Sequence, residues 1–178
     1  MGRVPDGYHI TRADNDEVAT LVEIDLAASQ LFAPTGLIAE ADLLEHVPET
    51  VFGDAITMGH LFSLRDHRGA PVGFALTSVR GETLYLDQIS VHPDHGRKGL
   101  GAALVSRVVD DAKDRGLKTV ALSTFRDLPW NGPFYRKLGF KEIRPDKLDP
   151  WMVELEKIQA ETLDVSKRCF MRKKLGWW

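Results

Sequence analysis

The feature that most constrains the fold of this chain is a change of hydrophobic period between residues 83 and 123. Residues 83–91 are rich in β-branched and aliphatic side chains and predict a strand. A turn rich in glycine and basic residues follows, and from Leu100 onward apolar side chains recur every four positions, which is typical of an amphipathic helix. Gly116 is expected to end this helix, and residues 118–123 predict a second strand. Strand, helix and strand in this order predict a right-handed parallel βαβ unit.

The turn between the first strand and the helix has the composition of a phosphate-binding loop. Gly99 and Gly101 lack the Cβ atoms that would hold a ligand away from the backbone, and Arg97 and Lys98 add positive charge. A helix that begins here offers free N–H groups and the positive end of its macrodipole. A phosphate or pyrophosphate is therefore the expected ligand. An ordinary turn with solvated basic side chains has the same composition, and a single Gly-x-Gly does not separate the two.

Two common phosphate-binding motifs do not match this loop. A dinucleotide-binding fingerprint needs a third glycine three residues after Gly101, where the chain has Leu104. A Walker A loop needs Ser or Thr directly after its Gly-Lys pair, and the run from Lys98 to Leu100 does not supply it.

The stretch instead resembles motif A of the GNAT family of N-acetyltransferases. In that family a loop of the form Gln/Arg-x-x-Gly-x-Gly/Ala follows a strand that ends in Val-x-Pro, and the matching residues here are Val91, Pro93, Gly99 and Gly101. Gly96 departs from the pattern, because it stands where the family has Gln or Arg, and Arg97 comes one place later. The departure leaves open which side chain assists the backbone.

A second motif supports the same resemblance. Residues 131–140, read NGPFYRKLGF, are similar to motif B of the family, which runs from an Asn to Phe-Tyr-x-Lys-Leu-Gly-Phe. The two motifs occur in the family's order and at about its spacing. The resemblance implies that acetyl-CoA contacts the strand end, the loop and the second motif. The implied cofactor-binding residues are Ile89, Ser90, Val91, Gly96, Arg97, Lys98, Gly99, Leu100, Gly101, Ala102, Asn131, Phe134 and Tyr135.

The rest of the chain predicts an antiparallel meander that leads into the βαβ unit. Further strands are expected at residues 8–11, 59–65, 71–79, 140–144 and 166–175. Further helices are expected at residues 14–31, 39–46, 131–138 and 150–163. Pro48 is interpreted as the stop of the second of these helices. The basic residues of the last strand indicate a solvated sheet edge: Lys167, Arg168, Arg172, Lys173 and Lys174.

Element order and resemblance together imply one α/β domain over residues 1–178. Its expected form is a mixed, mostly antiparallel sheet with helices on both faces and the parallel βαβ unit at the cofactor site. The implied function is transfer of an acetyl group from acetyl-CoA to a primary amine, by direct transfer in a ternary complex. Two alternatives stay open: a non-catalytic CoA-binding module of the same fold, and a protein or peptide N-acetyltransferase.

Amide formation from a thioester requires a base for the ammonium and an acid for the leaving thiolate. Tyr135 matches the motif B tyrosine and is the candidate acid; the alternative is a core tyrosine at a helix start. Asp87 is the candidate base, because strict alternation places it on one face of its strand with Tyr85, Ile89 and Val91, where desolvation would raise its pKa. A buried structural aspartate is the alternative. His92 is a rival base directly after the strand.

The acceptor is expected to lie beside the first two helices. The resemblance implies that Phe32 and Leu37 touch the substrate, and Tyr85 is a third candidate substrate-binding residue. The alternative is that these side chains only pack on the sheet. Acidic residues nearby would attract a cationic amine: Glu40, Asp42 and Glu45. A small, amino-acid-like amine is therefore favoured over a protein N-terminus or a histone-type lysine.

Composition excludes several other classes of protein. A formal charge of −3 argues against general nucleic-acid affinity. Cys169 is the only cysteine, so there is no internal disulfide framework, and a buried residue is favoured over a nucleophile. No metal-ligand motif and no apolar stretch of membrane-spanning length is visible, and the chain is expected to be cytoplasmic. The sequence leaves formation of a homodimer open.

Overall fold

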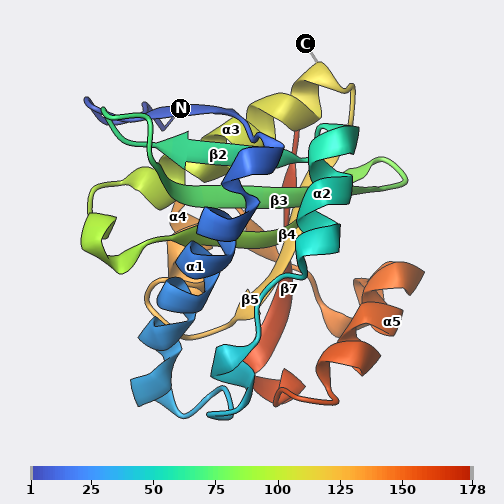
Figure 1. The fold of residues 1–178 in the computed structure, drawn as a ribbon. Helices are drawn as coiled ribbons and strands as arrows, with labels where there is room; N and C mark the ends of the chain where they lie inside the picture. The colour runs from blue at the N-terminus through green and yellow to red at the C-terminus, as the bar shows by residue number, and fades with distance from the viewer. Residues whose placement is uncertain (1, 177–178) are drawn as a thin grey trace.

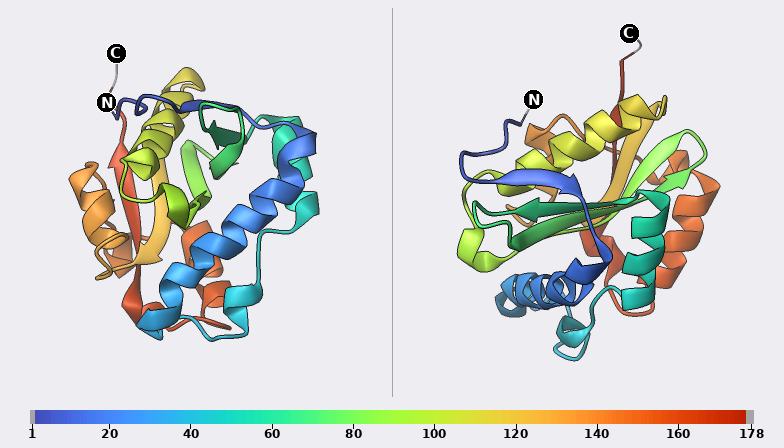
Figure 2. Two further views of the ribbon diagram at one scale, coloured as in Figure 1. Left: turned by 60° about the vertical axis from the view of Figure 1, so that its left-hand side comes forward. Right: turned by 45° about the horizontal axis from the view of Figure 1, so that its top comes forward.

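A computed structural model describes residues 2–176, in which seven strands form one mixed sheet with helices on both faces (Figures 1 and 2). The strands are β1 (His9–Arg12), β2 (Leu61–Arg65), β3 (Pro71–Arg80), β4 (Thr83–Val91), β5 (Thr119–Phe125), β6 (Lys141–Glu142) and β7 (Arg168–Lys174). The α-helices are α1 (Val18–Ser29), α2 (Glu49–Met58), α3 (Leu100–Asp114), α4 (Gly132–Lys137) and α5 (Pro150–Gln159). The predicted α/β fold class is confirmed.

The strand order is β1-β2-β3-β4-β5-β7-β6, and every neighbouring pair is antiparallel except β4 and β5. β2, β3 and β4 are the expected meander, β1 pairs with β2 at its edge, and β4, α3 and β5 are the expected βαβ unit. The order also corrects one interpretation. β7 lies between β5 and β6, so its basic residues do not mark a sheet edge.

The parallel pair is short, and this opens the sheet. β4 and β5 pair only where Thr83–Tyr85 lie beside Thr119–Ala121. Beyond that point β4 stays paired with β3 and β5 stays paired with β7, so the two strands diverge, as Figure 1 shows in the centre of the sheet. Backbone groups on the two facing edges are thereby left without a neighbouring strand, which is how a sheet can accept an extended ligand.

Each face of the sheet carries its own hydrophobic core. On one face the apolar stripe of α3, including Leu104 and Val108, packs on Leu84 and Val120, together with Tyr135 from α4. On the other face α1 and α2 pack over β2 and β3, and α5 packs over Tyr85 and its neighbours on β5 and β7. The two turned views in Figure 2 show the sheet between α3 on one face and α1 and α2 on the other.

The helix expected at residues 39–46 is wrong. Only a 3₁₀ turn, Asp42–Leu44, forms there, and α2 begins instead directly after Pro48. Pro48 precedes the first helical residue with φ −57° and ψ 141°, so it marks a helix start where a stop was expected. Phe52 of α2 is fully buried and meets the Phe74 ring edge-on at 5.1 Å, which fixes the helix to the sheet.

Two other boundaries differ from the prediction. The strand expected at residues 140–144 is only two residues long, because β6 pairs with β7 at Lys141 and Glu142 alone. The helix expected at residues 150–163 ends at Gln159.

Candidate active site

The loop before α3 presents free backbone amides and open space. Gly99 adopts φ +78°, and Arg97 also lies in the left-handed region at φ +60°. The first bond of the helix runs from the Ala103 N–H to the Gly99 carbonyl (3.1 Å). The amides of residues 100–102 consequently have no hydrogen-bond acceptor among residues 2–176. A Cβ built on Gly99 would meet nothing within 4 Å. The loop therefore fits a pyrophosphate, which needs N–H donors and close backbone approach.

The other two glycines of this region have more local roles. The Gly96 N–H donates to the Pro93 carbonyl (3.0 Å), so it closes a 3₁₀ turn and is not free for a ligand. A Cβ on Gly101 would lie 3.6 Å from Phe134 Cζ, so this glycine faces the start of α4. The two family motifs, about 30 residues apart, therefore meet at Gly101 and Phe134.

The N-terminal segment holds the loop in place. Lys98 Nζ donates to Tyr8 Oη (3.2 Å), and the same hydroxyl lies 2.8 Å from His95 Nδ1. The Tyr8 and His95 rings also meet edge-on at 5.7 Å. Sequence reasoning missed Tyr8, because no local pattern links residues so far apart in the chain.

A buried carboxylate connects the end of β4 with α1. Asp25 Oδ1 accepts hydrogen bonds from Ser90 Oγ (3.0 Å) and Gln88 Nε2 (2.8 Å), and Asp25 Oδ2 accepts one from the Val47 N–H (2.9 Å). The Ser90 side chain thus points away from α3. Its neighbours Ile89 and Val91 pack toward the core beneath α3. This part of β4 can offer a cofactor its backbone, because its polar side chains are already engaged.

A β-bulge corrects the expected orientation of Asp87. Leu76 pairs with Gln88 and Thr77 with Leu86, so Asp87 is an extra residue without a partner on β3. The alternation of side chains therefore shifts at this point. Tyr85 belongs to the core under α5, whereas Ile89 packs against the core under α3. Asp87 does not share one face with Tyr85, Ile89 and Val91 as the simple alternation predicts.

Asp87 is exposed and lies on the part of β4 beyond its pairing with β5. Partial desolvation nevertheless raises its pKa above the ordinary value, and the Ser78 hydroxyl and the Arg80 charge act in the opposite direction. His92 has a structural role, because its Nδ1 accepts a hydrogen bond from the Asp94 N–H (3.1 Å) and caps the 3₁₀ turn before the loop.

Tyr135 combines a buried ring with an uncommitted hydroxyl. Its ring contacts Phe134 and Phe140 edge-on, at 5.0 and 5.8 Å. No hydrogen bond joins its Oη to any of residues 2–176. Burial raises the pKa of Tyr135 strongly, with the neighbouring Tyr85 adding to the rise. The hydroxyl therefore keeps its proton throughout the physiological range.

Tyr85 and Tyr135 approach each other from opposite faces of the sheet. Tyr85 packs with the Trp151 ring of α5 (5.2 Å), and Tyr135 packs in the core under α3. Tyr85 adds to the rise in the pKa of Tyr135, as a second buried phenol nearby would. The burial of Tyr85 raises its own pKa as well, ahead of a smaller effect of Asp87.

The expected acceptor residues lie on the face covered by α1, α2 and α5. Phe32 is half-buried, and its ring lies 5.7 Å from Phe125 and 6.0 Å from Trp130. Leu37 is also half-buried and follows the 3₁₀ turn that extends α1. The structure therefore places Phe32 near the open end of β5, and Leu37 on the loop that follows.

Neither Cys169 nor a metal cluster competes as a reactive group. Cys169 is buried, and desolvation raises its pKa to about 11, so its thiol is protonated at neutral pH.

Asn131 begins α4 as expected, but its amide donates to the Trp130 carbonyl (2.9 Å) and does not cap the helix. Within residues 2–176 no group of three metal-binding side chains is present, and no helix is long and apolar enough to cross a bilayer.

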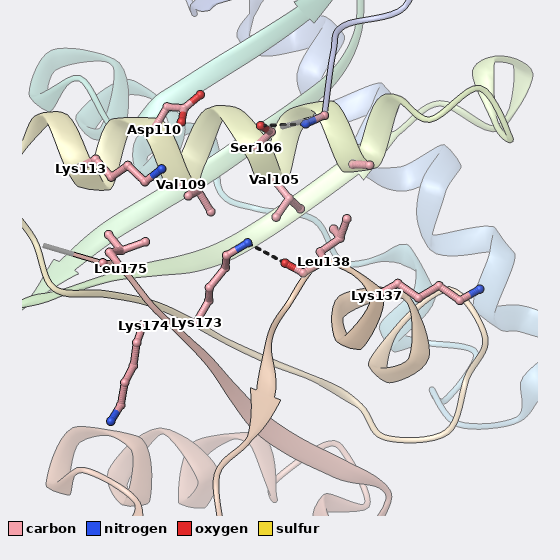
Figure 3. A pocket seen from close by; sticks show the side chains of 13 residues that line it. Val105, Ser106, Val109, Asp110, Lys113, Lys137, Leu138, Lys173, Lys174 and Leu175 are labelled. Carbon is pink, nitrogen blue, oxygen red and sulfur yellow. Dashed lines mark hydrogen bonds between the residues drawn. The ribbon is translucent and has the colours of Figure 1, made fainter. Parts of the chain in front are cut away.

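A separate cavity of about 350 Å³ lies between α3, the end of α4 and the end of β7 (Figure 3). Val105, Val109 and Leu138 line it, and Lys173 Nζ donates to the Leu138 carbonyl (2.7 Å). Of the residues expected to bind the cofactor, only Ala102 borders this cavity. It is distinct from the opening that holds Tyr135 and Asp87.

Fold, loop and opening together define a family, and comparison with known proteins agrees. The model of the acetyltransferase (GNAT) family matches residues 29–140, more than half of the chain. The chain belongs to this family, whose members are acyltransferases that use acetyl-CoA as donor.

Individual relatives differ in what they act on. The chain is 28% identical over 146 residues to a mycothiol acetyltransferase of Clavibacter michiganensis, covering 80% of this chain and 45% of that protein. It is 35% identical over 74 residues to the ribosomal protein bS18 alanine N-acetyltransferase of Escherichia coli, covering 42% of this chain and 50% of that protein. The matched regions thus span about half the length of these relatives.

The fold agrees with that of solved structures as well. The PaiA N-acetyltransferase of Thermoplasma acidophilum, solved in complex with coenzyme A, superimposes with a TM-score of 0.74 at 17% identity, covering 94% of this chain and 99% of that one. At this level of identity the likeness concerns the fold.

Proposed function

We propose that this protein is an acetyl-CoA-dependent N-acetyltransferase that acts on the primary amine of a small molecule. The observation that carries the proposal is the opening between β4 and β5. We assign to it a neutral phenol, Tyr135, and a carboxyl of raised pKa, Asp87, beside a strand that leads into the loop of free amides. We also propose that residues 1–178 act as one N-acetyltransferase domain.

Acetyl-CoA, when bound, supplies an activated acetyl thioester. The amides of residues 99–102 would hold its pyrophosphate, assisted by Arg97 and Lys98. The backbone of residues 89–91 would hold the arm that carries the thioester, as an added strand beside β4. Asn131 and Phe134 would line the opposite wall. Gly96 shapes the turn and contributes no free amide to this site.

Two proton transfers are assigned to the chain's own residues. Asp87 takes a proton from the acceptor's ammonium group, directly or through water, and its raised pKa brings it closer to the working range of a base. Tyr135 Oη gives a proton to the departing sulfur and is suited to this because burial keeps it neutral. With Cys169 protonated and buried, direct transfer in a ternary complex is favoured over an acyl-cysteine route.

A small acceptor is supported by the aromatic wall of Phe32, Phe125 and Trp130, and by Tyr85 beside Asp87. A second candidate is the N-terminus of a protein, which the similarity to the bS18 alanine N-acetyltransferase favours. The two candidates require the same chemistry and differ only in the width of the acceptor site.

Release of free thiol from acetyl-CoA in the presence of amines tests the proposal. Small primary amines and unstructured peptides should be compared side by side, with acetyl-CoA binding measured in parallel by calorimetry. Turnover on small amines supports the proposal, and turnover on peptides alone assigns the second candidate. Tight binding of coenzyme A without any turnover would reveal a CoA-binding module and refute the enzyme.

A further inference from the structure

Arg168, the first residue of β7, is a half-buried cation without a carboxylate partner in the described chain. Its Nη2 donates to Ser123 Oγ (3.2 Å), and its guanidinium carbon lies 4.6 Å from the centre of the Phe125 ring. Its Nε is buried and makes no hydrogen bond to any of residues 2–176. No ion pair joins Arg168 to an acidic side chain in the same part of the chain.

Other arginines that are withdrawn from water are paired. Arg65 Nε lies 2.6 Å from Glu17 Oε1, and Arg172, four residues along the same strand as Arg168, pairs with Asp149 through Nη2. The Nε of Arg172 also lacks a hydrogen bond within residues 2–176, so the missing carboxylate is what distinguishes Arg168. Removal of a guanidinium from water is costly unless a negative charge and hydrogen bonds compensate. The Phe125 ring supports the flat face of Arg168, but it cannot accept the N–H groups that point outward in the guanidinium plane.

The position of Arg168 connects it with the reacting groups. Arg168 lies two residues before Phe170, which packs with Tyr85 in the core under α5, so alternation along β7 places the guanidinium on the same face of the sheet as Tyr85. Desolvation lowers the pKa of Arg168, and Tyr85, Cys169 and Tyr135 act to raise it. Tyr85 in turn responds to Asp87 as well as to Arg168. Beyond the effect of burial, Asp87 raises the pKa of Tyr85 and Arg168 lowers it, as a carboxylate and a guanidinium near the same phenol would.

Ser123, which accepts the hydrogen bond from Arg168, is itself held in place by α5. Ser123 Oγ accepts from Arg168 Nη2 and donates to Gln159 Oε1 of α5 (3.2 Å). This network engages one N–H of Nη2 and leaves the edge at Nη1, which makes no hydrogen bond to residues 2–176, for a ligand. A guanidinium edge of this kind binds a carboxylate through two parallel hydrogen bonds, which a lysine cannot reproduce.

We propose that Arg168 binds a carboxylate of the acceptor, so that the acceptor is an amino acid or a close analogue with its amine directed to Asp87 and its carboxylate to Arg168. This inference rests on the proposed function and narrows it to one class of amine. Acceptor and site would then have complementary charges at both ends, with Tyr85 beneath the bound molecule.

The test compares matched acceptors that differ only in the carboxylate. Amino acids, their amides and the corresponding decarboxylated amines should be assayed with the wild-type protein, Arg168→Gln and Arg168→Lys. For the wild type, kcat/KM should be about 10- to 100-fold higher for the acid than for the amide, as expected for a charged bidentate contact. Arg168→Gln should abolish most of this ratio through KM of the acid, and Arg168→Lys should restore only part of it.

Arg144→Gln is the matched control, because it removes an equal charge from an exposed pair with Asp146. Its acid-to-amide ratio should equal that of the wild type. KM for acetyl-CoA and the midpoint of thermal unfolding should be recorded for every variant, so that a folding defect is recognised. Equal effects of Arg168→Gln on acid and amide, or no preference in the wild type, would overturn the inference and leave the acetyltransferase intact.

Direct binding separates this inference from the proposed function. If no amine is acetylated, the shift in thermal unfolding caused by N-acetyl amino acids should be measured for the wild type and Arg168→Gln. A stabilising shift in the wild type that Arg168→Gln loses supports the carboxylate site even without turnover. An equal shift in both proteins, or none in either, refutes it.

Discussion

Replacement of Tyr135 by phenylalanine separates catalysis from stability in this fold. The substitution removes one hydroxyl that makes no hydrogen bond with residues 2–176 and keeps the ring that packs against Phe134 and Phe140. Because no hydrogen bond is lost, the change in the free energy of unfolding should stay below about 1 kcal/mol. For a chain of 178 residues that corresponds to a shift in Tm of no more than about 2–4 °C.

The catalytic effect should be far larger. Loss of a general acid lowers kcat by about 10²- to 10⁴-fold, equivalent to about 3–5 kcal/mol in the activation free energy. KM for acetyl-CoA should change little, because the hydroxyl acts on the departing sulfur. A thioester whose thiol is more acidic than coenzyme A needs less help from an acid, so the deficit of the variant should shrink with such a donor.

Steady-state kinetics of thiol release, run with both donors and with Tyr85→Phe as comparison, provides the assay. Tyr85→Phe removes the facing hydroxyl and should act mainly on KM of the acceptor. A kcat for Tyr135→Phe within about threefold of the wild type, or a deficit that is the same for both donors, would refute the assignment of the acid.

Three further changes test other parts of the site. Gly101→Ala should leave Tm nearly unchanged, because a Cβ there meets only Phe134 Cζ at 3.6 Å, yet weaken acetyl-CoA binding in calorimetry by about tenfold or more. Asp87→Asn should remove the acidic limb of the pH–rate profile. Folding raises the pKa of Asp87, so the ionised carboxylate destabilises the folded protein at any pH above the ordinary pKa of an aspartate. Asp87→Asn removes this charge and should therefore raise Tm at about pH 7. The gain should vanish below about pH 4, where the wild-type carboxyl is protonated in both the folded and the unfolded state. Gly132→Ala should cost about 1–3 kcal/mol or more in chemical denaturation and disturb α4, because its Cβ would overlap the Arg126 carbonyl oxygen.

The sequence predicts the cofactor side of this molecule better than the acceptor side, and the reason is physical. The strand, loop and helix at residues 83–114 follow from local signals: period, glycine and proline. α2 was missed because Pro48 can end one helix or begin another, and only the burial of Phe52 against the sheet decides between them.

Features that depend on strand pairing were not visible in the sequence. The bulge at Asp87 arises from its register with β3, and a single strand read by itself always alternates. The sequence groups Arg168 with several solvated cations. In the fold β7 lies between β5 and β6, so Arg168 is half-buried next to the proposed acceptor site. The roles of Tyr135, Asp87 and the loop residues remain predictions that the experiments above decide.

The hydrogen bonds of Asp25 join the two regions that we propose as donor and acceptor sites. One carboxylate holds Ser90, on the strand assigned to the donor, and Val47, in the loop that leads to α2 on the proposed acceptor side. We expect any movement of β4 on donor binding to reach this loop through Asp25. Binding free energies of two sites joined in this way are coupled, and the coupling is equal in both directions. We expect the two substrates to bind in a preferred order, with the affinity for each depending on the presence of the other.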